Sequence, residues 1–208
     1  MSLSFENINF RYNNKFSQNT LIFSNFSLYI KKGEKVGIFG KTGTGKTTLV
    51  KFITKEEKLQ KGRIIFQNKD IRKAKNPFER ISILFQKPEK QFVFPNIKDE
   101  IDFILNGREE ETDSKINELA KEFGFNLKLY WDRNIYSFSP GELKLIQIIL
   151  VLSAEKPYLI LDDPFLFLDE EQIKIFKKIL LNHNNSTILI FARNQVGFEE
   201  LINREVIL

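Results

Sequence analysis

The sequence contains no cysteine, a single histidine among 208 residues, and no linker rich in proline, glycine or serine. Without cysteine the chain cannot form a disulfide framework or a thiolate metal site, which fits a reducing compartment. The N-terminal residues lack the basic and then apolar pattern of a signal peptide. The longest nearly apolar run, Leu145–Ala154, falls far short of the roughly 20 residues that span a bilayer. We therefore expect any membrane role to come through a partner.

Composition and charge are ordinary for a folded domain. Hydrophobic residues make up 42% of the chain and charged residues 28%, and the formal net charge is +5. This excess of basic residues would suit nucleic acid or an anionic membrane, but the lysines are scattered rather than gathered in a stripe. The pattern favours a solvated surface, and we expect no nucleic-acid partner.

A glycine-rich segment carries the clearest chemical signal. Its eight residues, Gly40-Lys41-Thr42-Gly43-Thr44-Gly45-Lys46-Thr47, fit the phosphate-binding pattern G-x-x-x-x-G-K-T. The alternative is a glycine-rich turn with an incidental lysine. That alternative does not explain why a buried-strand pattern over 35–39 precedes the segment and a helical pattern over 47–53 follows it. The sequence therefore predicts a nucleotide site.

The residue types in this loop assign their roles. The glycines allow consecutive backbone N–H groups to converge on a β-phosphate. Lys46 should reach the β- and γ-phosphates, and the Thr47 hydroxyl should bind Mg²⁺. Together with Thr48, the loop residues 40–47 form the predicted nucleotide-binding set.

The order of the patterns along the chain predicts an α/β fold. Strands are expected over 4–11, 21–30, 36–39, 63–66, 81–85, 158–161, 187–191 and 205–208, with turns at Lys32-Gly33 and Lys61-Gly62. Helical spacing runs from about 97 to 123, from 140 to 153 and from 170 to 181. This order implies a mostly parallel core sheet, covered on both faces, with an antiparallel N-terminal portion. We expect one domain over 1–208, with a smaller helical subdomain over roughly 88–155.

An acidic pair ends one of the buried strand patterns. Asp162 and Asp163 follow four apolar residues, which places a carboxylate at the carboxyl end of a core strand. A Mg²⁺ ion bound to a nucleotide needs an oxygen ligand at that edge of the sheet. The pattern alone is common by chance, but the phosphate loop upstream makes Asp162 the predicted metal-associated residue.

With these features placed, the remaining landmarks resemble those of the ATP-binding subunits of ABC transporters over nearly the whole chain. Phe10-Arg11-Tyr12 is similar to the family's adenine-stacking loop, and Phe85-Gln86 is similar to its Q-loop. Phe138-Ser139-Pro140-Gly141-Glu142 resembles the signature L-S-G-G-Q/E, and Leu168-Asp169 resembles the D-loop. The resemblance implies a P-loop NTPase fold of the ABC ATPase type. It also implies that ATP and Mg²⁺ are the cofactors. It also implies that Tyr12 stacks on adenine and that Gln86 contacts Mg²⁺ and the attacking water.

A longer segment suggests a subclass. Residues 84–95, LFQKPEKQFVFP, resemble F-Q-N-P-E-x-Q-[LF]-x-x-P of the ATPases of energy-coupling factor (ECF) importers, which take up vitamins and metal ions. Phe92, Val93 and Phe94 are also compatible with plain core packing. In the family this region meets the membrane subunit, so the resemblance makes Gln91–Asp102 a candidate docking surface.

The chain departs from the family's pattern at three positions. Asp163 stands where a glutamate normally polarises the attacking water, and Arg193 stands where the family has its switch histidine. Arginine keeps a positive charge but cannot act as a neutral acceptor near pH 7. Pro140 replaces a glycine of the signature and removes one backbone N–H, although proline suits the first turn of a helix. The only histidine, His183, lies in a polar turn and is expected to be exposed and not catalytic.

In the family, each nucleotide lies between one chain's phosphate loop and the signature of a second chain. The resemblance therefore implies an ATPase subunit whose catalytic residues are Asp163, Gln86 and Arg193. It implies that Thr47, Gln86 and Asp162 bind the metal. It also implies that Ser139 and Gly141 contact the nucleotide bound by the second chain. Because its own site is altered, we expect a heterodimer with a related ATPase. We further expect a transmembrane coupling subunit, a substrate-binding membrane subunit and a place at the cytoplasmic face of the cell membrane.

Other functions remain open at this point. The chain could be a structural subunit that binds ATP without hydrolysing it, or the ATPase of another ABC transporter class. DNA-repair and chromosome-organising ATPases share the motifs, but the segment between Gln86 and Ser139 is too short for their coiled-coil arms. Small GTPases and nucleotide kinases would not explain the signature-like segment or Tyr12. The transported substrate is chosen by membrane components, so this sequence does not identify it.

Overall fold

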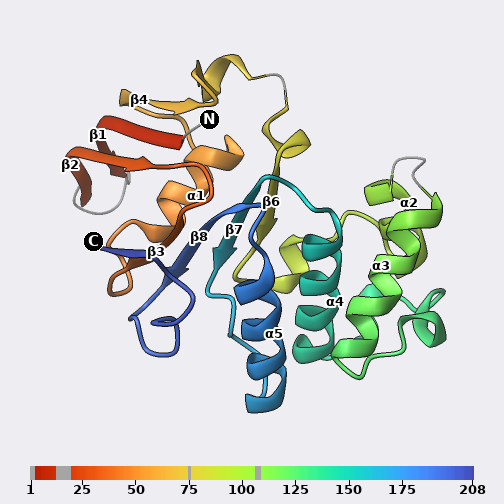
Figure 1. The fold of residues 1–208 in the computed structure, drawn as a ribbon. Coiled ribbons are helices and arrows are strands. Elements are labelled where there is room, and N and C mark those ends of the chain that lie inside the picture. The colour runs from red at the N-terminus through yellow and green to blue at the C-terminus, as the bar shows by residue number, and fades with distance from the viewer. Residues whose placement is uncertain (1–2, 13–19, 75, 106–108) are drawn as a thin grey trace.

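Two sheets and five α-helices form the fold (Figure 1), which is known from a computed structural model that describes residues 3–12, 20–74, 76–105 and 109–208. Four antiparallel strands form the first sheet in the order β2-β1-β4-β5: β1 (Leu3–Tyr12), β2 (Thr20–Ile30), β4 (Lys61–Phe66) and β5 (Lys69–Asp70). Five parallel strands form the second in the order β6-β7-β8-β3-β9: β3 (Lys35–Phe39), β6 (Ile81–Leu84), β7 (Tyr158–Asp162), β8 (Thr187–Ala192) and β9 (Arg204–Ile207). The predicted α/β class, with a parallel core and an antiparallel N-terminal portion, is confirmed, and the antiparallel portion is a separate sheet.

The parallel sheet is buried on both faces. Every residue of β7 and β8 is buried, and alternate side chains enter different core clusters. Leu159 and Leu161 pack in one cluster with α4, whereas Tyr158 and Ile160 pack in the other with α1. Near-continuous apolar runs in these strands follow from this two-sided burial, because successive side chains of a strand point to opposite faces.

The helices divide between the two faces of the parallel sheet. Helix α1 (Lys46–Thr54) lies between the two sheets, and α4 (Pro140–Ser153) and α5 (Glu170–Asn182) cover the opposite face (Figure 1). Helices α2 (Ile97–Leu105) and α3 (Glu109–Glu122) lie beyond α4. Short 3₁₀ helices, η1 to η5, span Ile71–Lys73, Pro77–Glu79, Pro88–Lys90, Leu127–Tyr130 and Ile135–Ser137.

Two helices begin with reciprocal capping. In α4, Ser139 Oγ accepts the N–H of Glu142 while the Glu142 carboxylate accepts the N–H of Ser139. Asp169 and Gln172 form the same arrangement at the start of α5. Each pair satisfies backbone donors that a helix start otherwise leaves unpaired, so both starts are fixed by local sequence.

The structure corrects the expected turn at Lys61-Gly62. Both residues belong to β4, and the pairing of β1 with β4 shifts register between Glu6 and Asn9. Gly62 has φ of +90°, and a Cβ there would lie 2.5 Å from the Glu6 carbonyl oxygen. The glycine therefore marks an irregularity inside a strand pair rather than its end. The two-residue strand β5 was not predicted, and the helical spacing from 97 to 123 belongs to two helices.

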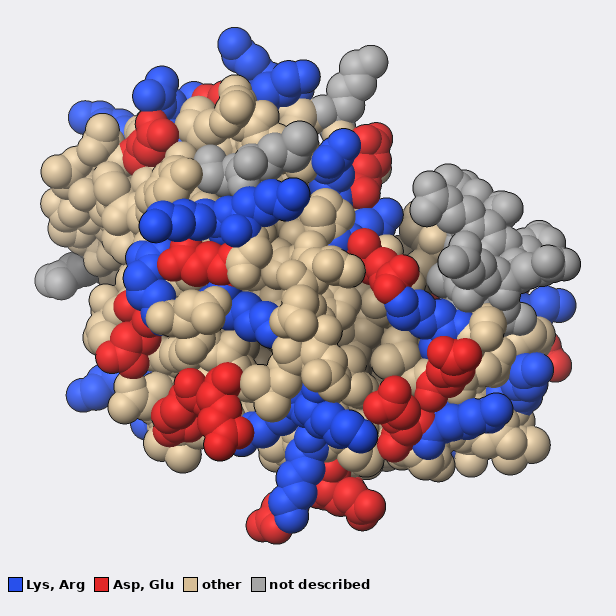
Figure 2. Space-filling view, in the orientation of Figure 1, with Lys and Arg blue, Asp and Glu red and all other residues tan. Residues whose placement is uncertain are grey.

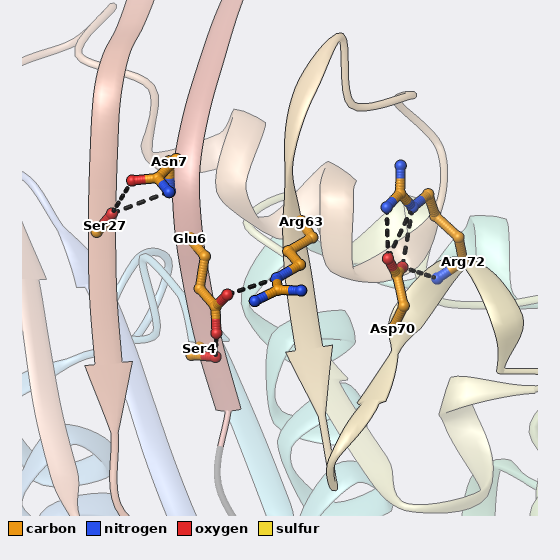
Figure 3. A network of polar contacts seen from close by, with 7 residues as sticks. All are labelled: Ser4, Glu6, Asn7, Ser27, Arg63, Asp70 and Arg72. Carbon is orange, nitrogen blue, oxygen red and sulfur yellow. Dashed lines mark hydrogen bonds and ion pairs between the residues drawn. The ribbon is translucent and has the colours of Figure 1, made fainter.

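Polar contacts join neighbouring strands of the outer antiparallel sheet (Figure 3). Arg63 Nε donates to Glu6 Oε2 at 2.6 Å across the β4–β1 pair, and Ser27 Oγ accepts the N–H of Asn7 at 2.9 Å across the β1–β2 pair. The hydrogen bond from Arg63 lowers the pKa of the Glu6 carboxyl. Exposed ion pairs of this kind contribute little to stability, so the core beneath carries the sheet.

Lysine and arginine side chains are interspersed with aspartate and glutamate on the face shown in Figure 2. Among the residues that the structure describes, no helix combines the length and the apolar character that crossing a membrane requires.

Candidate nucleotide-binding site

The phosphate loop connects β3 to α1 at the carboxyl end of the parallel sheet. The Gly40 N–H donates to Ala192 O at the end of β8, which ties the start of the loop to the neighbouring strand. Gly45 has φ of +106°, and a Cβ there would meet the ring of Phe23 at 2.5 Å. Only glycine fits that position, both for its left-handed backbone and for the close approach of β2. The sequence thus folds locally into the strand, loop and helix that the motif requires.

The start of α1 offers unpaired backbone donors. The first intrahelical bond runs from the Leu49 N–H to Gly45 O at 2.9 Å, so the N–H groups of Lys46, Thr47 and Thr48 have no acceptor within the helix. No side chain caps this helix, and its first turn has no acidic residue. The helix therefore presents N–H groups and its positive dipole end to an anion.

Lys46 folds back over its own loop. Its Nζ donates to Gly40 O at 2.5 Å and to Lys41 O at 3.1 Å. These carbonyls hold the ammonium group at the mouth of the loop. A polyphosphate drawn to the N–H groups of α1 would therefore meet a cation already in place.

A cavity of about 390 Å³ opens beside the loop. Eleven residues line it: Tyr12, Thr20, Ile22, Thr42, Gly43, Gly45, Lys46, Thr47, Thr48, Gln86 and Asp163. The phenol of Tyr12 lies 3.2 Å from Thr48 Oγ1, and its ring meets Phe10 edge-on. The structure thus brings Tyr12 and Gln86 to the phosphate loop from distant parts of the sequence. A larger hollow of about 740 Å³ lies around His183 and Lys115 and contains none of the motif residues.

The acidic pair lies at the end of β7, next to this cavity. Asp162 is 3% exposed, and burial together with the charge of Asp163 raises the pKa of its carboxyl to about 6. Burial also raises the pKa of Asp163, against the opposing attraction of Lys46. Gln86 Nε2 donates to Asp163 Oδ2 at 2.7 Å. The backbone of Asp163 has φ of +45°, and its N–H donates to Phe191 O at 2.8 Å. Two carboxylates and an amide are therefore gathered at one strand end.

These side chains match the chemistry of a magnesium site. The Thr47 hydroxyl, the carbonyl oxygen of the Gln86 amide and the Asp162 carboxylate are hard oxygen donors, which Mg²⁺ prefers. A cation would also relieve the cost of the buried negative charge on Asp162. Among the described residues, no cluster of three or more His, Cys, Asp or Glu side chains gathers to hold a metal by itself. Mg²⁺ would therefore arrive with the phosphates, which complete its ligands.

The signature-like residues lie apart from this cavity. Ser139 is the exposed N-cap of α4, Pro140 occupies the first turn and Gly141 is partly buried. A Cβ on Gly141 would lie 3.2 Å from Phe167 O, so the helix start packs closely against the loop that precedes α5. None of these residues lines the cavity beside Lys46. Their exposure leaves them available to another molecule.

Arg193 and His183 also lie outside the cavity. Arg193 is exposed just after β8, and within the described residues its guanidinium has no hydrogen-bond or ion-pair partner. His183 was expected to be exposed, but it is partly buried. Its Nε2 lies 3.0 Å from Ser186 Oγ in the turn after α5, which holds the ring against the protein. Burial lowers the pKa of this imidazole.

Two further residues near the site were not predicted. Lys144 and Gln147 are fully buried on α4, and both donate to the carbonyl oxygen of Phe85, the residue before Gln86. Their signal in the sequence is a lysine and a glutamine within the mostly apolar helical pattern over 140–153.

The carboxyl end of the parallel sheet carries a loop of backbone N–H groups, a lysine and a carboxylate. This geometry defines the class of P-loop nucleotide-binding proteins. A model of the ABC transporter family matches residues 23–166. The chain belongs to the ABC transporter family of ATP-binding proteins, as the resemblance predicted. Members of this family bind ATP, generally with Mg²⁺, and generally hydrolyse it.

Relatives of known name point to one part of the family. The chain is 33% identical to the energy-coupling factor transporter ATP-binding protein EcfA1 of Fusobacterium nucleatum, over 91% of this chain and 72% of that protein. It is 29% identical to the biotin transport ATP-binding protein BioM of Rhizobium etli, over 82% of this chain and 77% of that one. The resemblance to ECF transporter ATP-binding subunits is therefore confirmed.

Solved structures share the fold. The ATP-binding subunit of an ABC transporter superposes with a TM-score of 0.85 at 20% identity, over 100% of this chain and 86% of that one. CbiO1 of Clostridium perfringens, part of the ABC transporter complex cbiONQ, superposes with a TM-score of 0.71 at 26% identity, over 99% of this chain and 83% of that one. The expected ABC ATPase fold is confirmed.

Proposed function

We propose that this ATP-binding subunit powers an ECF-type importer of vitamins or metal ions and forms the weaker half of an asymmetric ATPase pair. The observation that carries the proposal is the convergence of the α1 N–H groups, Lys46, Gln86 and Asp163 on one cavity. The relatives described above support the transporter class. We also propose that residues 1–208 form one ATP-binding domain with its helical part over roughly 88–155.

In this proposal, the loop residues 40–47 and Thr48 hold the phosphates of ATP, and the ring of Tyr12 stacks on adenine. Thr47, Gln86 and Asp162 hold Mg²⁺, which neutralises phosphate charge when it is bound. Asp163 and Gln86 orient the attacking water, since their side chains already share a hydrogen bond of 2.7 Å. Arg193 supplies a positive charge from the end of β8 toward the γ-phosphate.

Turnover at this site is proposed to be slow. Asp163 is one methylene shorter than the glutamate of the family's pattern, and a displacement on the order of 1 Å in a positioned group can lower a rate roughly 10²-fold. Arg193 stands where the family has a histidine, and an arginine side chain cannot accept a proton as a neutral histidine can. Neither change touches the phosphate loop, so ATP binding is retained.

The exposed start of α4 supports a paired assembly. Ser139 and Gly141 lie outside their own chain's cavity, which supports the proposal that they contact a nucleotide held by a second subunit. We propose that this subunit is a related ATPase that carries the glutamate and histidine missing here. The pair would sit at the cytoplasmic face of the membrane, held by a transmembrane coupling subunit beside a substrate-binding membrane subunit.

The decisive experiment compares ATP hydrolysis by the isolated chain with hydrolysis by the chain co-purified with its ATPase partner. We expect the isolated chain to bind MgATP and to hydrolyse it far more slowly than the pair does. Hydrolysis by the isolated chain at the rate of the pair would overturn the asymmetry.

A second candidate is a structural subunit that holds ATP without hydrolysing it. Arg193 favours this candidate, because its side chain is exposed and pairs with no group in the described part of the chain. Asp163→Asn in the assembled complex separates the two functions. Loss of transport supports hydrolysis at this site, whereas unchanged transport supports the structural role.

A further inference from the structure

Helix α4 contains two polar side chains that neither the signature nor the nucleotide cavity accounts for. Lys144 and Gln147 are each 0% exposed, and their neighbours on the helix are apolar. Burying an ammonium group removes its hydration, so its place in the fold depends on its partners. Neither residue lines the cavity beside Lys46.

Both side chains bind the backbone of Phe85. Lys144 Nζ lies 3.1 Å from the carbonyl oxygen of Phe85, and Gln147 Nε2 lies 3.0 Å from the same atom. The Gln147 amide also donates to Gln91 Oε1 at 2.9 Å, and this oxygen accepts the N–H of Phe85 at 3.5 Å. The N–H and the C=O of Phe85 are therefore both held by side chains.

These hydrogen bonds restrain the backbone nitrogen of Gln86. The Phe85 carbonyl lies in the same planar peptide unit as the Gln86 nitrogen, so restraining one restrains the other. From there the Gln86 side chain reaches the cavity and donates to Asp163 at 2.7 Å. Asp162 and Asp163 are also the charged groups that attract the Lys144 ammonium. Helix α4, the Gln86 segment and the end of β7 thus form one polar cluster.

Stability alone does not explain this cluster. Gln147 Oε1 is buried without a hydrogen-bond partner among the described residues. An unpaired buried acceptor destabilises a fold, and replacing both partners of a buried polar pair by apolar side chains of similar size is often neutral or stabilising. The buried polar groups therefore indicate a role other than holding the helix in place.

We propose that Lys144 and Gln147 are positioning residues that hold Gln86 at the nucleotide cavity and link it to the helix that begins at Ser139. The proposal rests on the proposed function, in which Gln86 serves this chain's nucleotide and Ser139 serves the partner's. A shift of α4 at its exposed start would then move the Phe85 carbonyl and, with it, Gln86. The two nucleotides of the pair would be coupled through α4.

The first test is hydrogen exchange on the full-length chain without nucleotide, for the wild type, Lys144→Met and Gln147→Leu. In both variants we expect amides of residues 85–94 to exchange at least about tenfold faster, since local opening governs exchange. Amides of the phosphate loop should keep their rates, and the Tm should stay the same or rise. The matched controls are Leu145→Met, a buried change on the same helix, and Lys121→Met, which removes an exposed lysine. Both controls should leave residues 85–94 unchanged.

Three outcomes would overturn the proposal. Exchange over 85–94 within about twofold of the wild type would show that the contacts do not restrain this segment. Faster exchange throughout the chain with a lower Tm would assign the residues to the stability of the fold. A failure of both variants to fold would have the same meaning.

The second test measures ATP affinity with and without Mg²⁺, because Gln86 is the proposed metal contact. In Lys144→Met we expect the gain in affinity from Mg²⁺ to shrink by about tenfold, as is typical when a group that orients a ligand is lost. Affinity for ATP without Mg²⁺ should not change. A wild type that binds no ATP would refute the proposed function but not the restraint seen by exchange. An unchanged Mg²⁺ effect in a wild type that does bind would refute the positioning role.

Discussion

The phosphate loop and the ends of β7 and β8 lie at the same edge of the parallel sheet, yet they differ in what they hold. The loop has the groups of the motif: N–H groups at α1 without an acceptor in the helix, Lys46 folded over the loop, and Gly45 where a side chain would clash with Phe23. The strand ends instead carry Asp163, which is one methylene shorter than the glutamate of the family's pattern, and Arg193, which is exposed and has no polar partner among the residues that the structure describes. In the proposed function this difference makes binding and turnover separable properties of the site, so we expect that each can be altered without the other.

The largest effect is expected when the residues of the family's pattern are restored at the ends of β7 and β8. In the co-purified pair, Asp163→Glu combined with Arg193→His should raise ATP hydrolysis by this site roughly 10²-fold, because the carboxylate regains its reach and a neutral acceptor appears. Steady-state phosphate release measures the change. Adding Lys46→Ala to the same variant is the control, and it should remove the gain. A restored variant no faster than the parent would show that the two residues are not what limits turnover.

The next largest effect is expected when the phosphate loop loses the ammonium group of Lys46. Lys46→Ala should lower the affinity for MgATP by about 10- to 100-fold, the loss of a charge-assisted hydrogen bond of roughly 1.5–3 kcal/mol. Isothermal titration calorimetry reports it. Lys41→Ala keeps the backbone N–H that the loop would offer to a phosphate and removes only an exposed ammonium group, so it should cost less than about threefold. Equal losses in both variants would reduce Lys46 to a general surface charge.

A smaller effect concerns the buried acid behind the loop. The folded pKa of Asp162, about 6, lies above its ordinary value of 3.8. The folded state therefore holds its proton more tightly, and stability falls as the pH rises from about 4 to 6. Asp162→Asn should raise the free energy of unfolding by about 2 kcal/mol at pH 7.5 and leave it nearly unchanged at pH 4. Denaturant titrations at both pH values without nucleotide check this, and an equal change at both would point to packing instead.

The smallest expected effect lies in the loop that precedes α5. Phe167 is 46% exposed, and its φ of +70° is costly for a residue with a Cβ. Phe167→Gly should stabilise the isolated chain by about 1 kcal/mol because the strain is relieved. Leu166→Gly, an exposed neighbour outside the left-handed region, should destabilise it slightly. Thermal unfolding compares them, and a lower Tm for Phe167→Gly would mean that the phenyl ring packs usefully.

Local features of the fold were predictable, and features that depend on distant contacts were not. Strand, loop and helix around Lys46 follow from neighbouring residues, as do the helix that begins at Pro140 and the acidic strand end at Asp162. The irregularity at Gly62 depends on the carbonyl oxygens of β1, which no local pattern reports. The contacts of Lys144 with Phe85 join positions far apart in the sequence, so the lysine could be noticed but not placed.

The central claim is that this chain binds MgATP at the loop while its strand ends limit turnover. The most direct measurement determines MgATP affinity and hydrolysis on one preparation of the isolated wild-type chain, with Lys46→Ala as the reference. We expect saturable binding that is at least about tenfold tighter than that of the reference, together with hydrolysis no faster than that of the reference. Absence of binding, or hydrolysis as fast as that of the co-purified pair, would contradict the account.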